Sequence, residues 1–371
     1  MSDPRPILIA AGGTGGHVYP ALAIAEALRE RGVPVVWLGT RNGIEARSVP
    51  AAGFPIEWVS VAGLRGKSLL PTLLAPLRMA RACLQTWQII RRHRPAGVLG
   101  MGGFVAAPGS LLAVLKRLPL FIHEQNSVAG LTNRMFSRFA RQIFTAFPNV
   151  LSSRDQVSLI GNPVRREIEG LENPVERMQS RQGSARVLIV GGSLGARILN
   201  QTLPDALSLL SKSGDSNIKV EVWHQCGRVE FETTADHYSR NGITSESTDI
   251  SARVEPFIDD MAAAYEWADL LICRSGAMTV SELAAAGVAS VLIPYPHAVD
   301  DHQTGNARWL SDAGASVLLP QSDMDAQGLA KLLLEMLSDR QRLTDMSVRA
   351  RKLHRQGAAD YVADRLCEVA I

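Results

Sequence analysis

A short apolar run that ends in a glycine-rich turn and continues into a helical pattern occurs twice in this chain, 179 residues apart. The first copy covers residues 6–11 and turns at residues 12–17 (GGTGGH), and the second covers residues 186–190 and turns at residues 191–196 (GGSLGA). Further apolar runs alternate with helical patterns after each copy, which predicts parallel strands joined by helices on both faces of a sheet. We therefore expect two doubly wound α/β domains.

The remaining apolar runs locate the other expected elements. In the first half, strands are expected at residues 33–38, 97–101, 118–123 and 142–145, with a helix at residues 19–31. In the second half, a helix at residues 197–210 precedes strands at residues 220–225, 269–273 and 289–294. Such domains bind ligands beyond the carboxyl ends of their strands, so we expect the ligand in a cleft between the two domains.

Three glycine-rich turns follow expected strands. They are the two turns already named and GMGG at residues 100–103. Glycines let backbone N–H groups approach an anion, and the helix that follows adds a favourable dipole. A nicotinamide site is disfavoured, since Val18 replaces the third glycine of its fingerprint and both expected second strands end without the ribose-binding acid. Val61 likewise removes the first glycine of a Walker motif before Gly66-Lys67-Ser68.

Charge is divided unevenly between the two halves. Residues 1–160 contain 18 Lys and Arg against 7 Asp and Glu, a balance of +11, whereas residues 161–371 contain 21 against 29, a balance of −8. A basic half favours an anionic partner, such as lipid headgroups, nucleic acid or a phosphorylated substrate. Residues 67–92 mix Leu, Trp and Arg, a pattern that suits either a helix on an anionic membrane surface or an ordinary amphipathic core helix.

Two further features concern the cellular compartment. Residues 95–115 carry no charge but contain five glycines and two prolines, which predicts a strand, a glycine turn and a helix rather than a membrane span. The four cysteines are far apart and form no CxxC pair, which favours a reduced compartment with neither disulfides nor a zinc site. The apolar run before the first glycines is too short for the core of a signal peptide.

Seven segments resemble, in kind and order, the MurG family of glycosyltransferases. They are AGGTGGHVYPALAIAEAL (11–28), GLRGK (63–67), GMGGF (100–104), HEQNSVAGLTNR (123–134), GNPVR (161–165), GGSLGARILN (191–200) and CRSGAMTVSELAAAG (273–287). The resemblance implies the GT-B fold, in which two Rossmann-like doubly wound parallel-sheet domains face each other across a cleft. It implies an acceptor and membrane-associated domain at residues 1–162, a UDP-sugar donor domain at residues 163–349, and a C-terminal helix at residues 350–371 that packs back on the first domain.

The activity that this resemblance implies is an inverting transfer of N-acetylglucosamine from UDP-N-acetylglucosamine to the muramyl sugar of lipid I, which forms lipid II for peptidoglycan. No metal and no other cofactor is expected. The implied partners are the two substrates and the anionic lipids of the inner leaflet, and not nucleic acid. The enzyme is expected as a peripheral protein on the cytoplasmic face of the inner membrane.

The resemblance also implies donor contacts. Glu282 is expected to accept hydrogen bonds from the ribose hydroxyls, Ile258 to face the uracil, and the N–H groups at the start of the following helix to face the α-phosphate. Gln303 is expected to reach the sugar, with His302 as the alternative because the spacing here differs from the family pattern. The full expected donor set is Thr14, Gly15, Gly16, Asn126, Arg165, Ser193, Ile258, Ala277, Met278, Thr279, Val280, Ser281, Glu282 and Gln303.

The acceptor contacts implied are His123, Glu124, Asn126 and Asn133, whereas Phe104 stands where some relatives have Tyr and receives no polar role. A sugar hydroxyl is a weak nucleophile and needs a base to remove its proton. His17 suits this role because histidine titrates near neutrality, with an unperturbed pKa of about 6.5. Glu124 is the rival base, and the sequence leaves the choice open with a slight preference for His17.

Two other classes of protein fit parts of the pattern. Another GT-B transferase or a nucleotide-sugar epimerase would share the Glu282 site but lack a lipid-acceptor pocket and a membrane surface. A non-catalytic nucleotide-binding or nucleic-acid-binding module would use the basic half without turnover. The second class is disfavoured, because the chain has no zinc motif, no interleaving of aromatic and basic residues, and only 5% aromatic residues.

Overall fold

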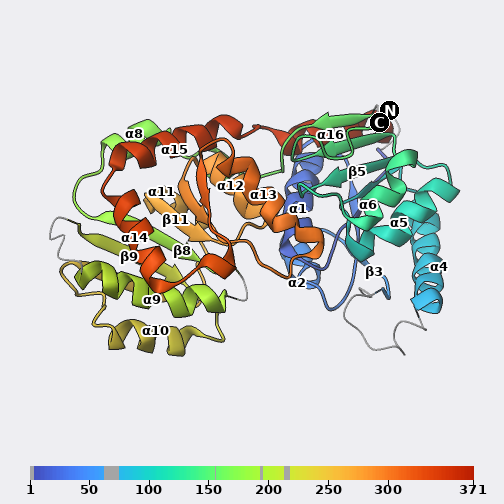
Figure 1. Cartoon of the computed structure of the whole chain (residues 1–371). Coiled ribbons are helices and arrows are strands. Elements are labelled where there is room, and N and C mark those ends of the chain that lie inside the picture. The colour runs from blue at the N-terminus through green and yellow to red at the C-terminus, as the bar shows by residue number, and fades with distance from the viewer. Residues whose placement is uncertain (1–3, 62–74, 155, 193–194, 213–217) are drawn as a thin grey trace. The chain divides into compact units, whose positions relative to one another are not determined.

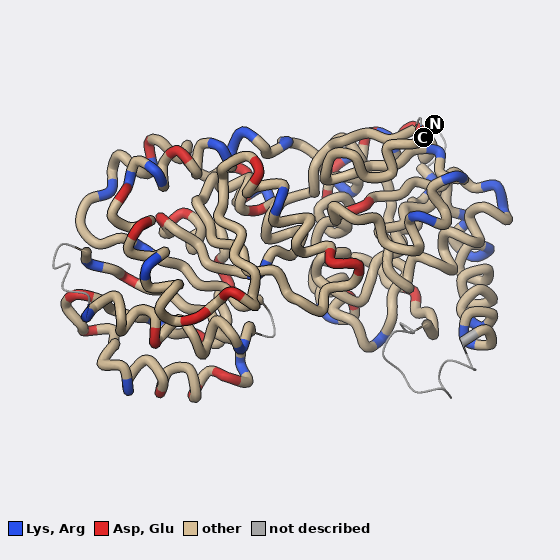
Figure 2. The backbone as a smooth tube through the Cα atoms, in the orientation of Figure 1, with Lys and Arg blue, Asp and Glu red and all other residues tan. Residues whose placement is uncertain are grey.

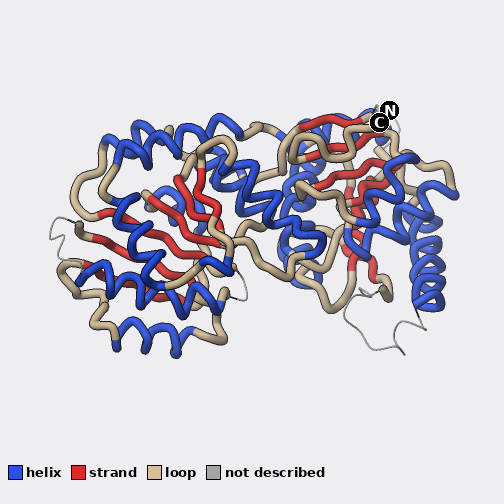
Figure 3. The backbone as a smooth tube through the Cα atoms, in the orientation of Figure 1, coloured by secondary structure: helices blue, strands red, loops and turns tan. Residues whose placement is uncertain are grey.

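The computed structural model describes residues 4–61, 75–154, 156–192, 195–212 and 218–371, which form two compact units (Figure 1). One unit extends to Arg165 and also contains Arg355–Ile371, and the other comprises Arg166–His354. The chain therefore passes between the units twice. The predicted alternation of strands and helices is confirmed in both (Figure 3).

The first unit is built on a seven-stranded parallel sheet in the order β3-β2-β1-β4-β5-β6-β7. Its strands are β1 (Ile7–Ala10), β2 (Val35–Gly39), β3 (Ile56–Trp58), β4 (Gly97–Gly100), β5 (Leu120–Glu124), β6 (Gln142–Thr145) and β7 (Val157–Leu159). All the strands expected from buried apolar runs are present. Strands β3 and β7 were not expected from the sequence, because these edge strands have only three residues each and are partly exposed.

Helices cover both faces of this sheet. They are α1 (Gly15–Glu30), α2 (Glu45–Ala51), α4 (Ala75–His93), α5 (Gly103–Leu115), α6 (Leu131–Phe136) and α16 (Ala358–Ala370), with a short 3-10 helix η1 (Ser137–Phe139). Ile7 and Ile9 of β1 lie in a core with α1 and α16, whereas Leu8 and Ala10 lie in a core with α4 and α5. Side chains alternate across a strand, so one buried strand contributes to both cores.

The second unit has a six-stranded parallel sheet in the order β10-β9-β8-β11-β12-β13. Its strands are β8 (Ala185–Val190), β9 (Val220–Gln225), β10 (Ile250–Glu255), β11 (Leu270–Cys273), β12 (Ala289–Leu292) and β13 (Ser316–Leu318). Its helices are α7 (Arg166–Glu169), α8 (Pro174–Gln179), α9 (Arg197–Lys212), α10 (Phe231–Arg240), α11 (Met261–Trp267), α12 (Ala277–Ala286), α13 (His302–Ser311), α14 (Ala326–Leu337) and α15 (Arg340–Leu353), with 3-10 helices η2 (Val299–Asp301) and η3 (Gln321–Asp323). Apolar residues of α9 and α14 cover one face of the sheet.

The uncharged stretch at residues 95–115 folds as predicted, with β4 followed by a glycine turn and then α5. Within the described part of the chain, no helix is both long enough and apolar enough to cross a membrane. Basic residues are frequent along α4 and at the turn after α5, as Figure 2 shows.

Candidate active site

The expected acceptor residues gather at the carboxyl edge of the first sheet. Strands β1, β4 and β5 are neighbours there, so the turns that follow them meet although they are far apart in the sequence. Gly102, in the turn after β4, adopts φ +88°, and a Cβ on it would lie 3.5 Å from His17 Nε2 and 3.1 Å from Asn133 Nδ2. A glycine is therefore needed at this position both for its backbone conformation and for the close approach of two candidate site residues.

His17 lies in the first turn of α1, behind the glycine loop. The Thr14 hydroxyl and His17 Nδ1 are 3.1 Å apart, and Thr14 is the N-cap residue of the helix. The imidazole is half-buried, whereas Thr14 is exposed. Thr14, Gly15 and Gly16 thus present the start of a helix dipole beside an oriented imidazole, an arrangement that suits a reaction in which negative charge develops.

Glu124, at the end of β5, is 2% exposed, and both of its carboxylate oxygens accept hydrogen bonds. Oε1 accepts from Asn126 N at 3.0 Å and from Asn126 Nδ2 at 3.4 Å, while Oε2 accepts from Gly130 N at 2.9 Å and from Asn133 Nδ2 at 2.8 Å. Burial raises the pKa of this carboxyl, and the donors oppose that shift. The carboxylate therefore organises the turn between β5 and α6.

His123 precedes Glu124 and is fully buried. Its Nδ1 lies 3.0 Å from Gln125 Nε2, and its Nε2 lies 3.3 Å from the Gly161 carbonyl oxygen. Burial lowers the pKa of His123 to about 4, with a smaller contribution from His17. The imidazole is consequently neutral near pH 7, where it donates to the Gly161 carbonyl and accepts from the Gln125 amide.

Glu45 is a buried residue of this site that sequence reasoning missed. It begins α2, and its Oε2 accepts from Gly13 N at 3.0 Å. Its Oε1 accepts from Thr40 N at 2.9 Å and from the Thr40 hydroxyl at 2.6 Å. One carboxylate thus ties the glycine loop after β1 to the end of β2. No local motif indicates this role, because its partners Thr40 and Gly13 are 5 and 32 residues away in the chain.

Replacing Glu45 by Ala is expected to lower the free energy of unfolding by about 3 kcal/mol, because a hydrogen-bonded carboxylate is lost and buried N–H groups are left without an acceptor. Urea denaturation of the full chain, followed by circular dichroism, measures the change. Glu26→Ala is the matched control, since Glu26 is an exposed glutamate of α1. Equal stability of the two variants would mean that Glu45 does not hold the loop.

The expected donor residues lie at the carboxyl edge of the second sheet. After β11 the chain turns at residues 274–276 and enters α12, with Gly276 as the N-cap residue. Asn306 Nδ2 donates to the Ser275 carbonyl at 3.2 Å, and Arg274 donates to the carbonyls of Ile293 and Pro294. These bonds hold the turn. The first N–H groups of α12 belong to the expected residues Ala277, Met278 and Thr279, and a helix start of this kind suits a phosphate. Val280 N instead donates to the Gly276 carbonyl at 2.9 Å.

Glu282 lies further along α12 and is half-buried, whereas its neighbour Ser281 is buried. Its Oε2 accepts a hydrogen bond from the Tyr265 hydroxyl of α11 at 2.9 Å. Ile258 is buried in the segment after β10, between that strand and α11. The second unit therefore holds the expected ribose, phosphate and uracil residues on neighbouring loops and helices.

The remaining expected donor residues differ in how well the structure describes them. At the start of α13, Gln303 Oε1 accepts from Tyr295 N at 2.9 Å, and His302 Nδ1 lies 2.7 Å from the Val299 carbonyl, so both side chains contact the preceding loop. Arg165 is exposed at the end of the first unit's main segment. Ser193 lies outside the described residues.

Two aspartates before α13 were not singled out from the sequence. Asp300 has φ +53° and Asp301 has φ +49°, both in the left-handed region. Such conformations cost free energy, and they cluster at functional sites. Asp and Asn adopt them more readily than other non-glycine residues, but the letters VDDHQ carry no signal of it.

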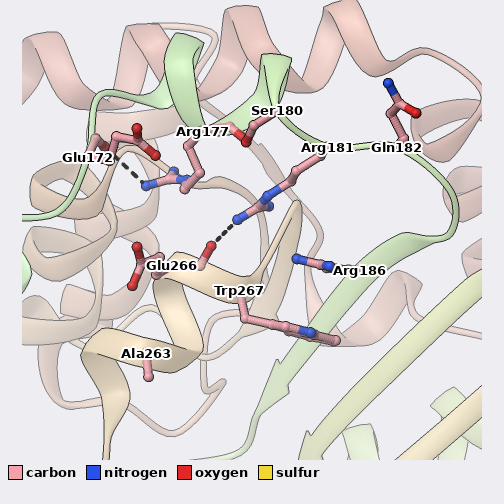
Figure 4. A pocket seen from close by; sticks show the side chains of 9 residues that line it. All are labelled: Glu172, Arg177, Ser180, Arg181, Gln182, Arg186, Ala263, Glu266 and Trp267. Atoms are coloured by element: carbon pink, nitrogen blue, oxygen red, sulfur yellow. Dashed lines mark hydrogen bonds between the residues drawn. The ribbon is translucent and has the colours of Figure 1, made fainter.

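A separate pocket of about 580 Å³ lies near the amino ends of β8 and β11, away from these residues (Figure 4). Arg177 and Arg181 reach into it from α8 and its following turn. Arg177 donates to the carbonyl of Ala286 at the C-terminus of α12, and Arg181 donates to those of Glu266 and Ala268 at the C-terminus of α11. Cations at helix C-termini complement the helix dipole, so we assign these guanidinium groups to the stability of α11 and α12.

Comparisons with known proteins match the two halves of the chain to two domains of one family. Residues 7–145 match the glycosyltransferase family 28 N-terminal domain, and residues 186–362 match the glycosyltransferase family 28 C-terminal domain. The chain is 49% identical over 364 residues to the UDP-N-acetylglucosamine--N-acetylmuramyl-(pentapeptide) pyrophosphoryl-undecaprenol N-acetylglucosamine transferase of Nitrosococcus oceani, and the match covers 98% of each protein. It is 52% identical over 362 residues to the transferase of the same name from Alkalilimnicola ehrlichii, again over 98% of each.

Solved structures show the same likeness. The crystal structure of Acinetobacter baumannii MurG matches with a TM-score of 0.83 and 38% identity, over 98% of this chain and 100% of that one. The calicheamicin glycosyltransferase CalG4 matches with a TM-score of 0.66 over the full length of both chains, but at 16% identity it supports the fold alone. The predicted GT-B fold class is confirmed by these matches.

Proposed function

Since this chain belongs to the MurG family, within glycosyltransferase family 28, we propose that it transfers N-acetylglucosamine from UDP-N-acetylglucosamine to the muramyl sugar of lipid I. The observation that carries the proposal is the identity of about half of all residues, over nearly the whole chain, to transferases named for this reaction. The geometry of both sheet edges supports it, because oriented polar side chains and helix starts lie at each of them.

For the donor, we propose that Glu282 accepts from the ribose hydroxyls while the N–H groups at the start of α12 bind the diphosphate. The backbone at Ile258 faces the uracil, and Gln303 or His302 contacts the sugar. Arg165, Ser193 and the loop residues Thr14, Gly15, Gly16 and Asn126 complete the donor contacts. The N–H groups and the dipole of α12 offset the negative charge that develops on the departing UDP.

For the acceptor, we propose that His17 is the base. The acceptor oxygen forms a bond to the anomeric carbon as the bond from that carbon to UDP breaks, and the hydroxyl proton moves to His17. This single displacement inverts the anomeric centre. His17 is favoured over Glu124 because its ring is partly exposed, whereas Glu124 is buried and accepts bonds at both oxygens. Asn126 contacts the acceptor, and His123, Glu124 and Asn133 shape the wall behind it.

Incubation with UDP-N-acetylglucosamine and a lipid I analogue tests the proposed function. We expect UDP release that depends on the acceptor, together with a disaccharide product of inverted configuration. UDP-glucose in place of the donor and a lipid analogue without the muramyl sugar serve as controls. An epimerase would instead convert the sugar nucleotide without an acceptor, and a binding module would release no UDP.

We propose further that the enzyme docks on the cytoplasmic face of the inner membrane through the outer side of α4. Ala82, Thr86, Ile89 and Ile90 are buried, so one side of α4 packs against its own unit. On the other side Leu77 is 67% exposed and Leu84 is 64% exposed. Arg78, Arg81, Arg91 and Arg92 are exposed as well. Apolar residues flanked by arginines suit binding to a surface of anionic lipid. The proposed acceptor is a membrane lipid, so the enzyme also has to reach such a surface.

Replacing Arg78 and Arg81 by Glu is expected to weaken binding to phosphatidylglycerol vesicles by at least about tenfold, since each basic residue near such a surface contributes about 1 kcal/mol. Leu77 and Leu84 to Ser should weaken it too, and salt should weaken the binding of the unaltered enzyme. Sedimentation with vesicles measures this, while activity on a short water-soluble acceptor should persist. Leu73 and Leu74, also expected to contribute, lie outside the described residues.

The control for the leucine changes is Leu209→Ser, because Leu209 is an exposed leucine of α9 in the other unit. It should leave vesicle binding unaltered. Equal binding to anionic and neutral vesicles, unaffected by the α4 changes, would show that α4 is only a packing helix.

A further inference from the structure

Tyr265 connects α11 to the carboxylate of Glu282. The residue is 1% exposed, and its hydroxyl donates to Glu282 Oε2 at 2.9 Å. A buried tyrosine hydroxyl needs a hydrogen-bond partner, and a carboxylate gives a stronger bond than a neutral acceptor. A carboxylate has about four acceptor sites, so this bond leaves it able to accept from other hydroxyl groups.

The helix that carries Tyr265 is fixed at both ends. At its N-terminus the Asp260 side chain accepts from Ala263 N at 2.9 Å. At its C-terminus Arg181 donates to the carbonyl of Glu266 (Figure 4) and to that of Ala268. The helix has only seven residues, so these two clamps restrict where the Tyr265 hydroxyl can lie. The phenol thereby helps to hold the half-buried Glu282 side chain, which belongs to a residue type with several staggered rotamers.

We infer that Tyr265 is a positioning residue for ribose recognition: it orients the Glu282 carboxylate before the nucleotide binds. Glutamate is among the side chains that lose most rotamer freedom when they are ordered, so a carboxylate that is already oriented binds a ligand more tightly. This inference rests on the proposed function, in which Glu282 accepts from the ribose hydroxyls. It adds that part of the selectivity for a ribonucleotide arises from a residue that need not touch it.

Tyr265→Phe removes only the hydroxyl and tests the inference. Binding of UDP and of its 2′,3′-dideoxy analogue is measured by calorimetry on the full chain. We expect UDP to bind about 3- to 10-fold more weakly to the variant. The analogue, which has no ribose hydroxyls, should bind as it does to the unaltered enzyme. The preference for UDP over the analogue should therefore shrink by the same factor.

Tyr238→Phe is the matched control. Tyr238 is equally buried in the same unit, and its hydroxyl lies 3.0 Å from His224 Nδ1 rather than near Glu282. This change should leave the preference for UDP unaltered. In a Glu282→Ala background, Tyr265→Phe should have no further effect on UDP binding, because the two residues act through one contact.

The outcomes separate the inference from its premise. Equal weakening of UDP and its analogue by Tyr265→Phe, or an effect that persists without Glu282, would overturn the role of Tyr265 while leaving the function intact. If Glu282→Ala itself leaves the preference for UDP unaltered, the ribose assignment in the proposed function fails instead.

Discussion

Replacing His17 by Ala is expected to lower turnover by about 10²- to 10⁴-fold, the usual contribution of a general base, while UDP binds nearly as before. The loss is large because a sugar hydroxyl keeps its proton near neutral pH, so attack without a base is slow. UDP binding should persist because the nucleotide contacts proposed for the second unit remain. Initial rates of UDP release under saturating donor and acceptor, with UDP affinity measured separately, test both parts.

Two further variants make the test of His17 specific. His237→Ala removes a histidine of α10 that pairs with Asp205 at 2.8 Å, and it should leave turnover unaltered. Glu124→Gln keeps the shape of the side chain but places an amide where the carboxylate accepts hydrogen bonds. We expect it to lower thermal stability, with a smaller loss of turnover than His17→Ala. The roles must be exchanged if the Glu124 variant is stable but inactive and the His17 variant stays active.

Replacing Glu282 by Ala is expected to weaken UDP binding by about 10- to 100-fold and to raise the Michaelis constant for the donor. Hydrogen bonds to a charged group contribute about 1.5–3 kcal/mol each, and the ribose hydroxyls lose theirs. Calorimetry with UDP measures the change. Glu335→Ala serves as the control, since Glu335 is an exposed glutamate of α14 that pairs with Arg342 at 2.6 Å. Unaltered UDP affinity in a folded Glu282 variant would falsify the assignment.

The architecture of both units could be predicted from local sequence. Strands such as β1 and β11 are buried on both faces, so they appear as continuous apolar runs, and parallel pairing follows from the helices between them. The glycine turns could also be predicted, because a positive φ or a close approach requires glycine, as at Gly13 and Gly102. The family resemblance then named Glu282 and His17 as candidates.

The elements that were missed or misjudged lack such local signals. The edge strands of both sheets were not predicted, namely β3, β7, β10 and β13. Edge strands are buried on fewer sides, and three of these four have only three residues. The helix α1 begins at Gly15, four residues before the expected start, because the chain folds into a helix directly within the glycine loop.

The sequence by itself determined the two α/β units, their glycine turns and the chemical types available at each strand end. Only the tertiary structure decided which of those groups are buried among hydrogen-bond partners and which stay partly exposed. The sequence left the choice between His17 and Glu124 open with a slight preference for His17, and the pairing of β5 beside β4 buries Glu124 among donors from three other residues. Glu45 and Tyr265 acquire their roles only from partners on other elements. Burial and hydrogen bonding depend on segments that are distant along the chain, and local sequence does not contain that information.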